Sequence, residues 1–126
     1  MTRILVVDDH ALVRRKVCGA LEEEGYQICG EAGTGSEAVE MAQGLKPDLV
    51  VLDLTMPELN GLDAARQILM KTPATRVLIL TMHEDEGLTR EVLTSGAAAC
   101  VIKSNTEHLI DEVHRLMGSN HHDYIL

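Results

Sequence analysis

The stretch Leu49-Val50-Val51-Leu52-Asp53 decides the fold. Its first four residues are apolar and include β-branched side chains, and the run is too short for a helix. This pattern is typical of a strand that is buried on both faces of a parallel sheet. Similar runs occur at Ile4–Val7 and Val77–Leu80, and weaker strand candidates lie at Tyr26–Glu31 and Ala99–Ile102. The sequence therefore predicts five strands.

Segments with helical spacing separate these strand candidates. The first segment carries Val13, Val17 and Leu21 on one face, as expected for a helix that packs on a sheet. Further helices are expected at Ser36–Gln43, Leu62–Lys71 and Asp85–Thr94, and along the apolar stripe from Leu109 to Met117. Residues that stop helices lie at or just past the ends of the first four, namely Gly25, Gly44, Pro73 and Gly96.

The alternation of strand and helix, repeated five times, predicts an α/β fold with a mostly parallel sheet. For a doubly wound sheet of five strands with right-handed crossovers, the common strand order is 2-1-3-4-5. The chain has 126 residues, 45% of them apolar, which fits one hydrophobic core. We expect residues 1–118 to form this domain, and the polar residues 119–126 to be a tail or the start of a linker.

Composition excludes several classes of function. A net charge of −9 argues against direct contact with nucleic acid. No apolar run is long enough to cross a membrane, and the N-terminus has no signal-peptide pattern, so a cytoplasmic protein is expected. Cys18, Cys29 and Cys100 are odd in number and far apart, so we expect small buried side chains rather than disulfides or a zinc site.

Polar residues follow four of the expected strands. Asp8 and Asp9 follow the first, Asp53 ends the third, Thr81 ends the fourth and Lys103 follows the fifth. In the order 2-1-3-4-5, ligands bind beyond the carboxyl ends of the strands, between strands 1 and 3. One aspartate at a strand end is usually a turn former or a helix cap. Five such residues at one edge of the sheet predict a functional site.

The residue types at this edge suggest a particular chemistry. Three close carboxylates repel one another, so either some of them take up protons or a cation binds. Oxygen ligands favour Mg²⁺, with Mn²⁺ as a substitute, over zinc. Lys103 is placed to meet an incoming anion, and Thr81 offers a hydroxyl donor. A metal, a lysine and a hydroxyl around one carboxylate are suited to phosphoryl transfer onto that carboxylate.

From Ile4 to about Met117, the sequence resembles the receiver domain of bacterial two-component response regulators, the CheY-like family. The motifs that carry the resemblance are Val6-Val7-Asp8-Asp9-His10, Asp53-Leu54-Thr55-Met56-Pro57-Glu58-Leu59-Asn60-Gly61, Leu80-Thr81, Ser95-Gly96-Ala97 and Lys103. The Asp-Asp-His opening and Leu80-Thr81-Met82-His83-Glu84 are most similar to receivers of the NarL/LuxR type. The resemblance implies the flavodoxin-like, CheY-like fold with five helices.

The resemblance also implies roles for individual residues. Asp53 would accept a phosphoryl group from a histidine kinase or a phosphotransfer protein, Lys103 would pair with that group, and Thr81 would turn toward it. The Mg²⁺ ligands that the resemblance implies are Asp8, Asp9, Asp53 and the backbone carbonyl of Thr55. Such a protein is a signalling phosphoacceptor and not a metabolic enzyme, because it assists only its own phosphorylation and dephosphorylation.

The expected output is a change of conformation that controls transcription, through a DNA-binding domain in a longer chain or through a partner; a homodimer stays open. Two departures from the family pattern bear on this output. Cys100 stands where the family often has an aromatic switch residue, and Ser104 follows Lys103 where proline is frequent. A cis bond before a residue other than proline costs about 2.5–4 kcal/mol, so we expect a trans bond before Ser104.

Two other functions stay open at this stage. A phosphatase of the haloacid-dehalogenase type also uses an aspartate at a strand end, but it needs a second aspartate two residues later, where this chain has Thr55. A stand-alone dimerisation or docking module with a dormant pocket is the second alternative, and the complete set of acidic, threonine and lysine residues argues against it.

Three weaker signals also yield expectations. In the glycine-rich stretch Gly33-Thr34-Gly35-Ser36, we expect Ser36 to cap a helix rather than a loop that binds a dinucleotide. His10 is expected to start a helix rather than to bind a metal. The resemblance suggests that His83 tunes the lifetime of the phosphoryl group, although a solvated loop histidine is the simpler interpretation.

Overall fold

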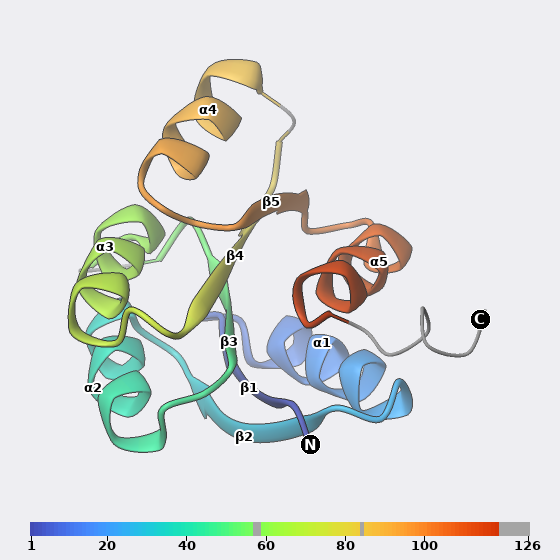
Figure 1. The fold of residues 1–126 in the computed structure, drawn as a ribbon. Coiled ribbons are helices and arrows are strands. Elements are labelled where there is room, and N and C mark those ends of the chain that lie inside the picture. Colours follow the sequence, from blue (N-terminus) through green and yellow to red (C-terminus); the bar gives the residue numbers. More distant parts are fainter. Residues whose placement is uncertain (57–58, 84, 119–126) are drawn as a thin grey trace.

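A computed structural model describes residues 1–56, 59–83 and 85–118 of the chain. Its strands form one parallel sheet in the order β2-β1-β3-β4-β5, so the predicted fold class and strand order are confirmed (Figure 1). The strands are β1 (Arg3–Val7), β2 (Gln27–Ala32), β3 (Leu49–Asp53), β4 (Arg76–Thr81) and β5 (Ala99–Ile102). Each lies within a residue or two of its predicted position.

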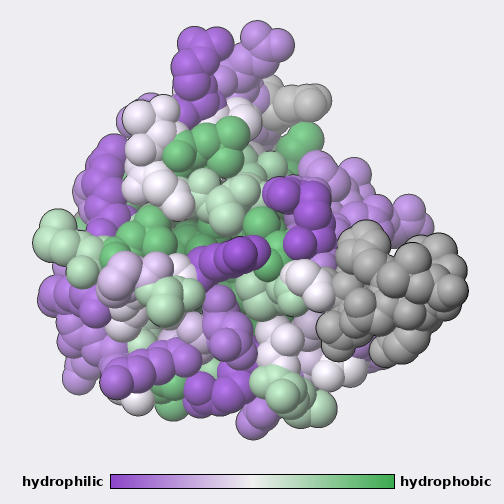
Figure 2. Space-filling view, in the orientation of Figure 1, coloured by the Kyte–Doolittle hydropathy of each residue, from purple (hydrophilic) through white to green (hydrophobic). Residues whose placement is uncertain are grey.

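Helices cover both faces of the sheet (Figure 1). One face carries α1 (Ala11–Glu23) and α5 (Thr106–Leu116), and the other carries α2 (Gly35–Leu45), α3 (Gly61–Lys71) and α4 (Glu86–Thr94). In Figure 2 the strongly apolar side chains gather mainly near the middle of the view, with hydrophilic ones among them, and hydrophilic side chains make up most of its outline. The layering therefore matches the hydropathy pattern of the chain.

The β3 strand shows why the sequence requires two layers of helices. Val50 and Leu52 pack in the cluster under α2, α3 and α4, whereas Leu49 and Val51 pack in the cluster under α1 and α5. All four side chains are fully buried. A strand with alternate side chains in two different cores has no solvent face, which explains its uninterrupted apolar run.

The ends of α2 differ from the prediction. Thr34, not Ser36, is the N-cap, and its hydroxyl accepts a hydrogen bond from the backbone N–H of Glu37 at 3.1 Å. At the other end the helix continues past Gly44, and Lys46 takes the left-handed conformation with φ 50°. The cap prediction was wrong by two residues because the chain offers two hydroxyl residues there, and only the geometry of the turn decides between them.

The predicted glycine stops after α1 and α4 are confirmed. Gly25 has φ 91° and Gly96 has φ 105°, in the left-handed region that side chains with a Cβ atom rarely adopt. The cysteines are free, as expected: Cys18 is buried, whereas Cys29 and Cys100 are only half-buried.

Residues 119–126, predicted to be a tail or linker, lie outside the described part of the chain. Within the described part, no helix has both the length and the apolar character that crossing a membrane requires.

Candidate functional site

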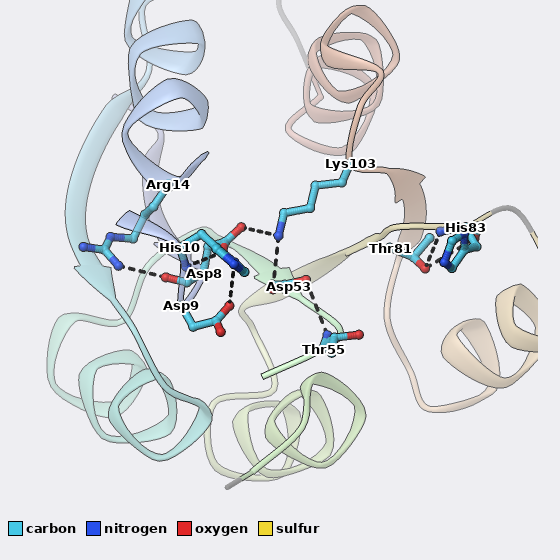
Figure 3. A network of polar contacts seen from close by, with 9 residues as sticks. All are labelled: Asp8, Asp9, His10, Arg14, Asp53, Thr55, Thr81, His83 and Lys103. Carbon is cyan, nitrogen blue, oxygen red and sulfur yellow. Dashed lines mark hydrogen bonds and ion pairs between the residues drawn. The ribbon is translucent and has the colours of Figure 1, made fainter. Parts of the chain in front are cut away.

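The carboxyl ends of β1, β3 and β5 bring the predicted site residues together (Figure 3). Asp8 follows β1, Asp53 ends β3 and Lys103 follows β5. Asp53 is level with Leu80, the last residue before Thr81 on β4, and Asp8 and Asp53 are 1% and 2% exposed. These two aspartates are therefore buried side by side at the edge where the strand order reverses, as the topology predicts.

Lys103 connects the two buried aspartates. Its Nζ lies 2.7 Å from Oδ2 of Asp8 and 3.2 Å from Oδ2 of Asp53. Its own side chain is only 10% exposed. Apart from this ion pair, Oδ2 of Asp8 has no hydrogen-bond partner in the described part of the chain. One ammonium therefore serves two carboxylates, and a buried oxygen is left with spare capacity to accept or to bind a cation.

The electrostatics of the site follow from this shortage of positive charge. Burial, and then the charge of Asp8, raise the pKa of Asp53 above its usual value, and Lys103 lowers it only in part. Burial opposes the charge on Lys103, but the hydrogen bond to Asp8 and the charges of both carboxylates raise its pKa overall. Lys103 thus stays protonated at neutral pH, whereas burial and the neighbouring Asp8 charge make the ionised form of Asp53 energetically unfavourable.

The other acidic residue of the predicted pair, Asp9, faces outward. Asp8, Asp9 and His10 each offer one possible metal-ligand atom, and these atoms lie within 4.8 Å of one another. No other group of three or more such side chains occurs in the described ranges. Asp53 is not part of that group. His10 is the N-cap of α1, as predicted, and its side chain is 71% exposed with Nδ1 3.2 Å from Oδ1 of Asp9.

The donor chemistry of this edge fits Mg²⁺. Mg²⁺ prefers carboxylate and carbonyl oxygens and keeps several of its waters. Asp8 offers a buried oxygen whose contact in the described part of the chain is the Lys103 ammonium, and Asp9 offers a partly exposed carboxylate beside it. His10 is less suited, because imidazole nitrogen is a ligand of zinc, copper and iron sites rather than of Mg²⁺.

The loop after β3 is tied to Asp53 at two points. The backbone N–H of Thr55 donates a long hydrogen bond to Oδ1 of Asp53 at 3.4 Å. A Cβ atom on Gly61 would lie only 2.6 Å from the carbonyl oxygen of Asp53 and 2.6 Å from Cα of Leu54. Only glycine lets α3 begin this close to the loop. Sequence reasoning assigned Gly61 no such task, although Gly61 ends the motif that begins at Asp53 and was a visible signal.

Thr81 lies at the edge of the site, but its hydroxyl forms hydrogen bonds with the backbone of His83 and not with Asp53. Its hydroxyl donates to the carbonyl oxygen of His83 at 3.3 Å and accepts from the N–H of His83 at 3.4 Å. Figure 3 shows both residues apart from the carboxylate of Asp53. The hydroxyl thus stabilises its own loop, through two bonds that are long enough to be readily exchanged.

Sequence reasoning missed Arg14. From the first turn of α1, its guanidinium donates to the backbone carbonyl of Asp8 at 2.8 Å (Figure 3). It also donates to Oε1 of Glu31 at 2.9 Å. The spacing of Arg14 from Asp8 places it near the site once a helix is assumed, but its partner on β2 is visible only in the fold.

The two departures from the family pattern are also clear in the structure. Cys100 is half-buried against the cluster under α2, α3 and α4. Burial raises the pKa of its thiol, and a hydrogen bond with Thr89 lowers that pKa in part. The peptide bond between Lys103 and Ser104 is trans, as predicted.

Comparison with known proteins agrees with this site. The family model for the response regulator receiver domain matches residues 4–114, which is most of the chain. The chain belongs to this family. It is a response-regulator receiver domain of the kind found in two-component systems.

Individual relatives place the receiver more closely. Protein CcdB of Bacillus subtilis is 40% identical over 119 residues, covering 94% of this chain and 99% of that protein. The transcriptional regulatory protein PdtaR of Mycobacterium tuberculosis is 44% identical over 101 residues, 80% of this chain, and this chain spans about half (49%) of its length. A LuxR-family response regulator from Aurantimonas has a TM-score of 0.88 at 35% identity, covering 94% of this chain and 87% of that one. The NarL/LuxR-type likeness is thereby confirmed.

Proposed function

We propose that Asp53 accepts a phosphoryl group from a histidine kinase or a phosphotransfer protein. The observation that carries the proposal is the buried Asp53 carboxylate with the Lys103 ammonium at 3.2 Å, beside a second buried carboxylate on Asp8. A cation already within contact distance of the nucleophile is placed to offset charge on an incoming phosphoryl group.

The transfer is an in-line displacement. An oxygen of Asp53 forms a bond to phosphorus as the bond from phosphorus to the donor's imidazole nitrogen breaks, and the imidazole leaves with that electron pair. Ionised Asp53 is the reactive form, and the forces that raise its pKa also keep it poorly solvated, which favours attack on phosphorus. Lys103 then exchanges its contact with Asp53 for a phosphoryl oxygen.

Mg²⁺, or Mn²⁺ in its place, would be held by Asp8, Asp9, Asp53 and the backbone carbonyl of Thr55. When bound, the ion offsets the charge of the phosphoryl oxygens and of the clustered carboxylates. The buried carboxylate of Asp8, which shares one ammonium with Asp53, and the partly exposed carboxylate of Asp9 support this assignment.

Phosphorylation then changes which groups contact each other. The added phosphoryl group carries about −1.5 to −2 charge at neutral pH, so it attracts the Thr81 hydroxyl and the Lys103 ammonium. Thr81 can turn only by leaving the carbonyl of His83, which frees the loop between β4 and α4. With Cys100 in place of a ring, the signal leaves the site through this backbone loop.

The expected output is regulation of transcription, by a DNA-binding domain in a longer chain or by a partner, with a homodimer as one form of the active state. The relatives described as a transcriptional regulatory protein and a LuxR-family regulator support this output. The domain acts as a switch rather than as an enzyme, since its only chemistry is on its own Asp53.

Intact-mass spectrometry after incubation with acetyl phosphate tests the proposal. With Mg²⁺ present, the wild-type chain should gain the mass of one phosphoryl group, and with a chelator it should not. Asp53→Asn should gain nothing, whereas Asp111→Asn, a change at an exposed aspartate of α5, should behave as wild type. Equal gain by Asp53→Asn and wild type would refute the assignment.

The same experiment separates the two alternatives. A stand-alone docking module would show no gain in mass under any condition. A phosphatase would release phosphate from monoesters over many turnovers. Thr55 argues against a phosphatase, because such an enzyme needs a carboxylate at this position as general acid and base, and a threonine hydroxyl cannot take that role.

A further inference from the structure

We propose that Arg14 is a positioning residue that holds Asp9 in place for Mg²⁺. The inference rests on the proposed metal site and goes beyond it, because Arg14 itself touches neither the metal ligands' carboxylates nor the phosphoacceptor. The argument begins with how the turn between β1 and α1 is held.

The backbone of Asp8 is fixed on both sides. Its N–H donates to the carbonyl of Ala32 on β2 at 3.1 Å, and its carbonyl accepts from Nη1 of Arg14 at 2.8 Å. Its side chain accepts from the N–H of His10 at 2.8 Å. Among the described residues, Arg14 thus supplies the one contact from a charged donor to the peptide group between Asp8 and Asp9.

Asp9 depends on that peptide group. Its side chain is 28% exposed, and it pairs with Nδ1 of His10, whose own side chain is 71% exposed. A peptide unit is planar, so the orientation of the Asp8 carbonyl also sets where the Cα atom of Asp9 lies. The N-cap residue His10 makes no side-chain capping bond at this helix start, so within the described residues the guanidinium of Arg14 is the side-chain donor from α1 that holds the turn.

The guanidinium is in turn held from the sheet. Nε of Arg14 donates to Glu31 at 2.9 Å, and Glu31 lies on β2 directly opposite Val6. The Arg14 side chain is 20% exposed and that of Glu31 is 31% exposed. Two donors in a fixed planar arrangement therefore join the α1 start, the β1 end and β2, which a flexible ammonium group could not do in the same way.

Charge alone predicts the opposite effect on metal binding. A positive group near a cation site weakens binding of the cation, so removal of Arg14 should tighten Mg²⁺ binding if Arg14 acts only through its charge. If Arg14 positions Asp9, its removal should weaken binding. The sign of the change therefore distinguishes the two roles.

The neighbouring Arg15 provides a matched control. Its Nε lies 3.9 Å from the same Glu31 oxygen, but its side chain is 75% exposed. Arg15→Met removes the same charge from almost the same place without removing the contact to the Asp8 carbonyl.

The test is a titration in which Mg²⁺ is added to the metal-free protein and the NMR shifts of the backbone amides are followed to give the Kd. We expect the Kd to rise about five- to tenfold in Arg14→Met, the loss that corresponds to one hydrogen bond of ordinary net strength. Arg15→Met should bind as wild type or slightly more tightly. Arg14→Lys, which keeps the charge but reaches only one acceptor, should lie between Arg14→Met and wild type.

Metal-free hydrogen exchange gives a second, independent measurement. In Arg14→Met the amides of Asp9 and His10 should exchange faster, while that of Val51 in the core of β3 should keep its protection. Unchanged Kd and unchanged exchange in a folded Arg14→Met variant would overturn the inference. If Arg14→Met does not fold, Arg14→Lys decides by the same criteria. Failure of the wild type to bind Mg²⁺ would refute the metal site instead. The hydrogen-exchange rates of Asp9 and His10 would then still show whether Arg14 holds this turn in place.

Discussion

Replacing Lys103 by methionine should expose the electrostatic strain of the site. Met keeps an apolar stem of similar length but removes the ammonium that contacts Asp8 and Asp53. Both carboxylates are almost fully buried, so the variant leaves two adjacent negative charges without compensation in a region that water reaches poorly.

The contact distances set the size of the effect. Since one ammonium lies 2.7 Å from one carboxylate oxygen and 3.2 Å from the other, these two oxygens are at most 5.9 Å apart. At an effective dielectric constant of about 20, two unit charges at this separation repel by about 3 kcal/mol. Breaking a buried ion pair costs about 3–5 kcal/mol in general. We therefore expect the free energy of unfolding to fall by about 3 kcal/mol at pH 8.

The loss should depend on pH. Lys103 lowers the pKa of Asp53, so its removal raises that pKa further above the value in the unfolded chain. An acid with a higher pKa in the folded state destabilises the fold when it is ionised. The deficit of Lys103→Met relative to wild type should thus be full at alkaline pH and shrink as the pH falls through the folded-state pKa of Asp53.

Urea unfolding at pH 8 and pH 5.5, followed by far-ultraviolet circular dichroism, measures this deficit. Adding Asp53→Asn to Lys103→Met should restore most of the lost stability at pH 8, because it removes the repulsion. Lys71→Met, at an exposed lysine of α3, is the control and should change stability little. Equal deficits at both pH values, with no rescue by Asp53→Asn, would refute the reasoning.

Four further substitutions have defined outcomes. Gly61→Ala should lower the free energy of unfolding by about 1–3 kcal/mol because its Cβ would meet the carbonyl of Asp53, whereas Gly44→Ala, with open space around it in α2, should raise it by about 0.5–1 kcal/mol; chemical denaturation measures both. Thr81→Val should still be phosphorylated but should lose the shift changes of the β4–α4 loop on phosphorylation, and retention of those changes would contradict its role. His83→Ala should change the rate of dephosphorylation, read by mass spectrometry over time; an unchanged rate leaves His83 an ordinary loop residue.

The fold was predictable because its signals are local and repeated. The apolar run of Leu49–Leu52 can be explained only by burial on two faces, and the left-handed glycines Gly25 and Gly96 mark two helix ends where side chains are disfavoured. The convergence of Asp8 and Asp53 then follows from strand order alone. Sequence thus predicted which residues meet, because topology fixes the edge of the sheet.

The parts that were not predictable depend on contacts between distant segments. The partnership of Arg14 with Glu31 requires the register of β1 against β2, which no short pattern contains. Likewise, the choice of Thr34 over Ser36 as the cap depends on where the turn enters α2. Nor could sequence show that Lys103 already contacts both buried aspartates, because a long side chain can adopt many rotamers.

Identifying the phosphorylated residue tests the central claim most directly. Borohydride reduces an aspartyl phosphate to homoserine, so the protein treated with acetyl phosphate and Mg²⁺ can be reduced, digested and sequenced by tandem mass spectrometry. The account predicts homoserine at position 53 and unmodified aspartate at positions 8 and 9. Homoserine at either of those positions, or at none of the three, would contradict it.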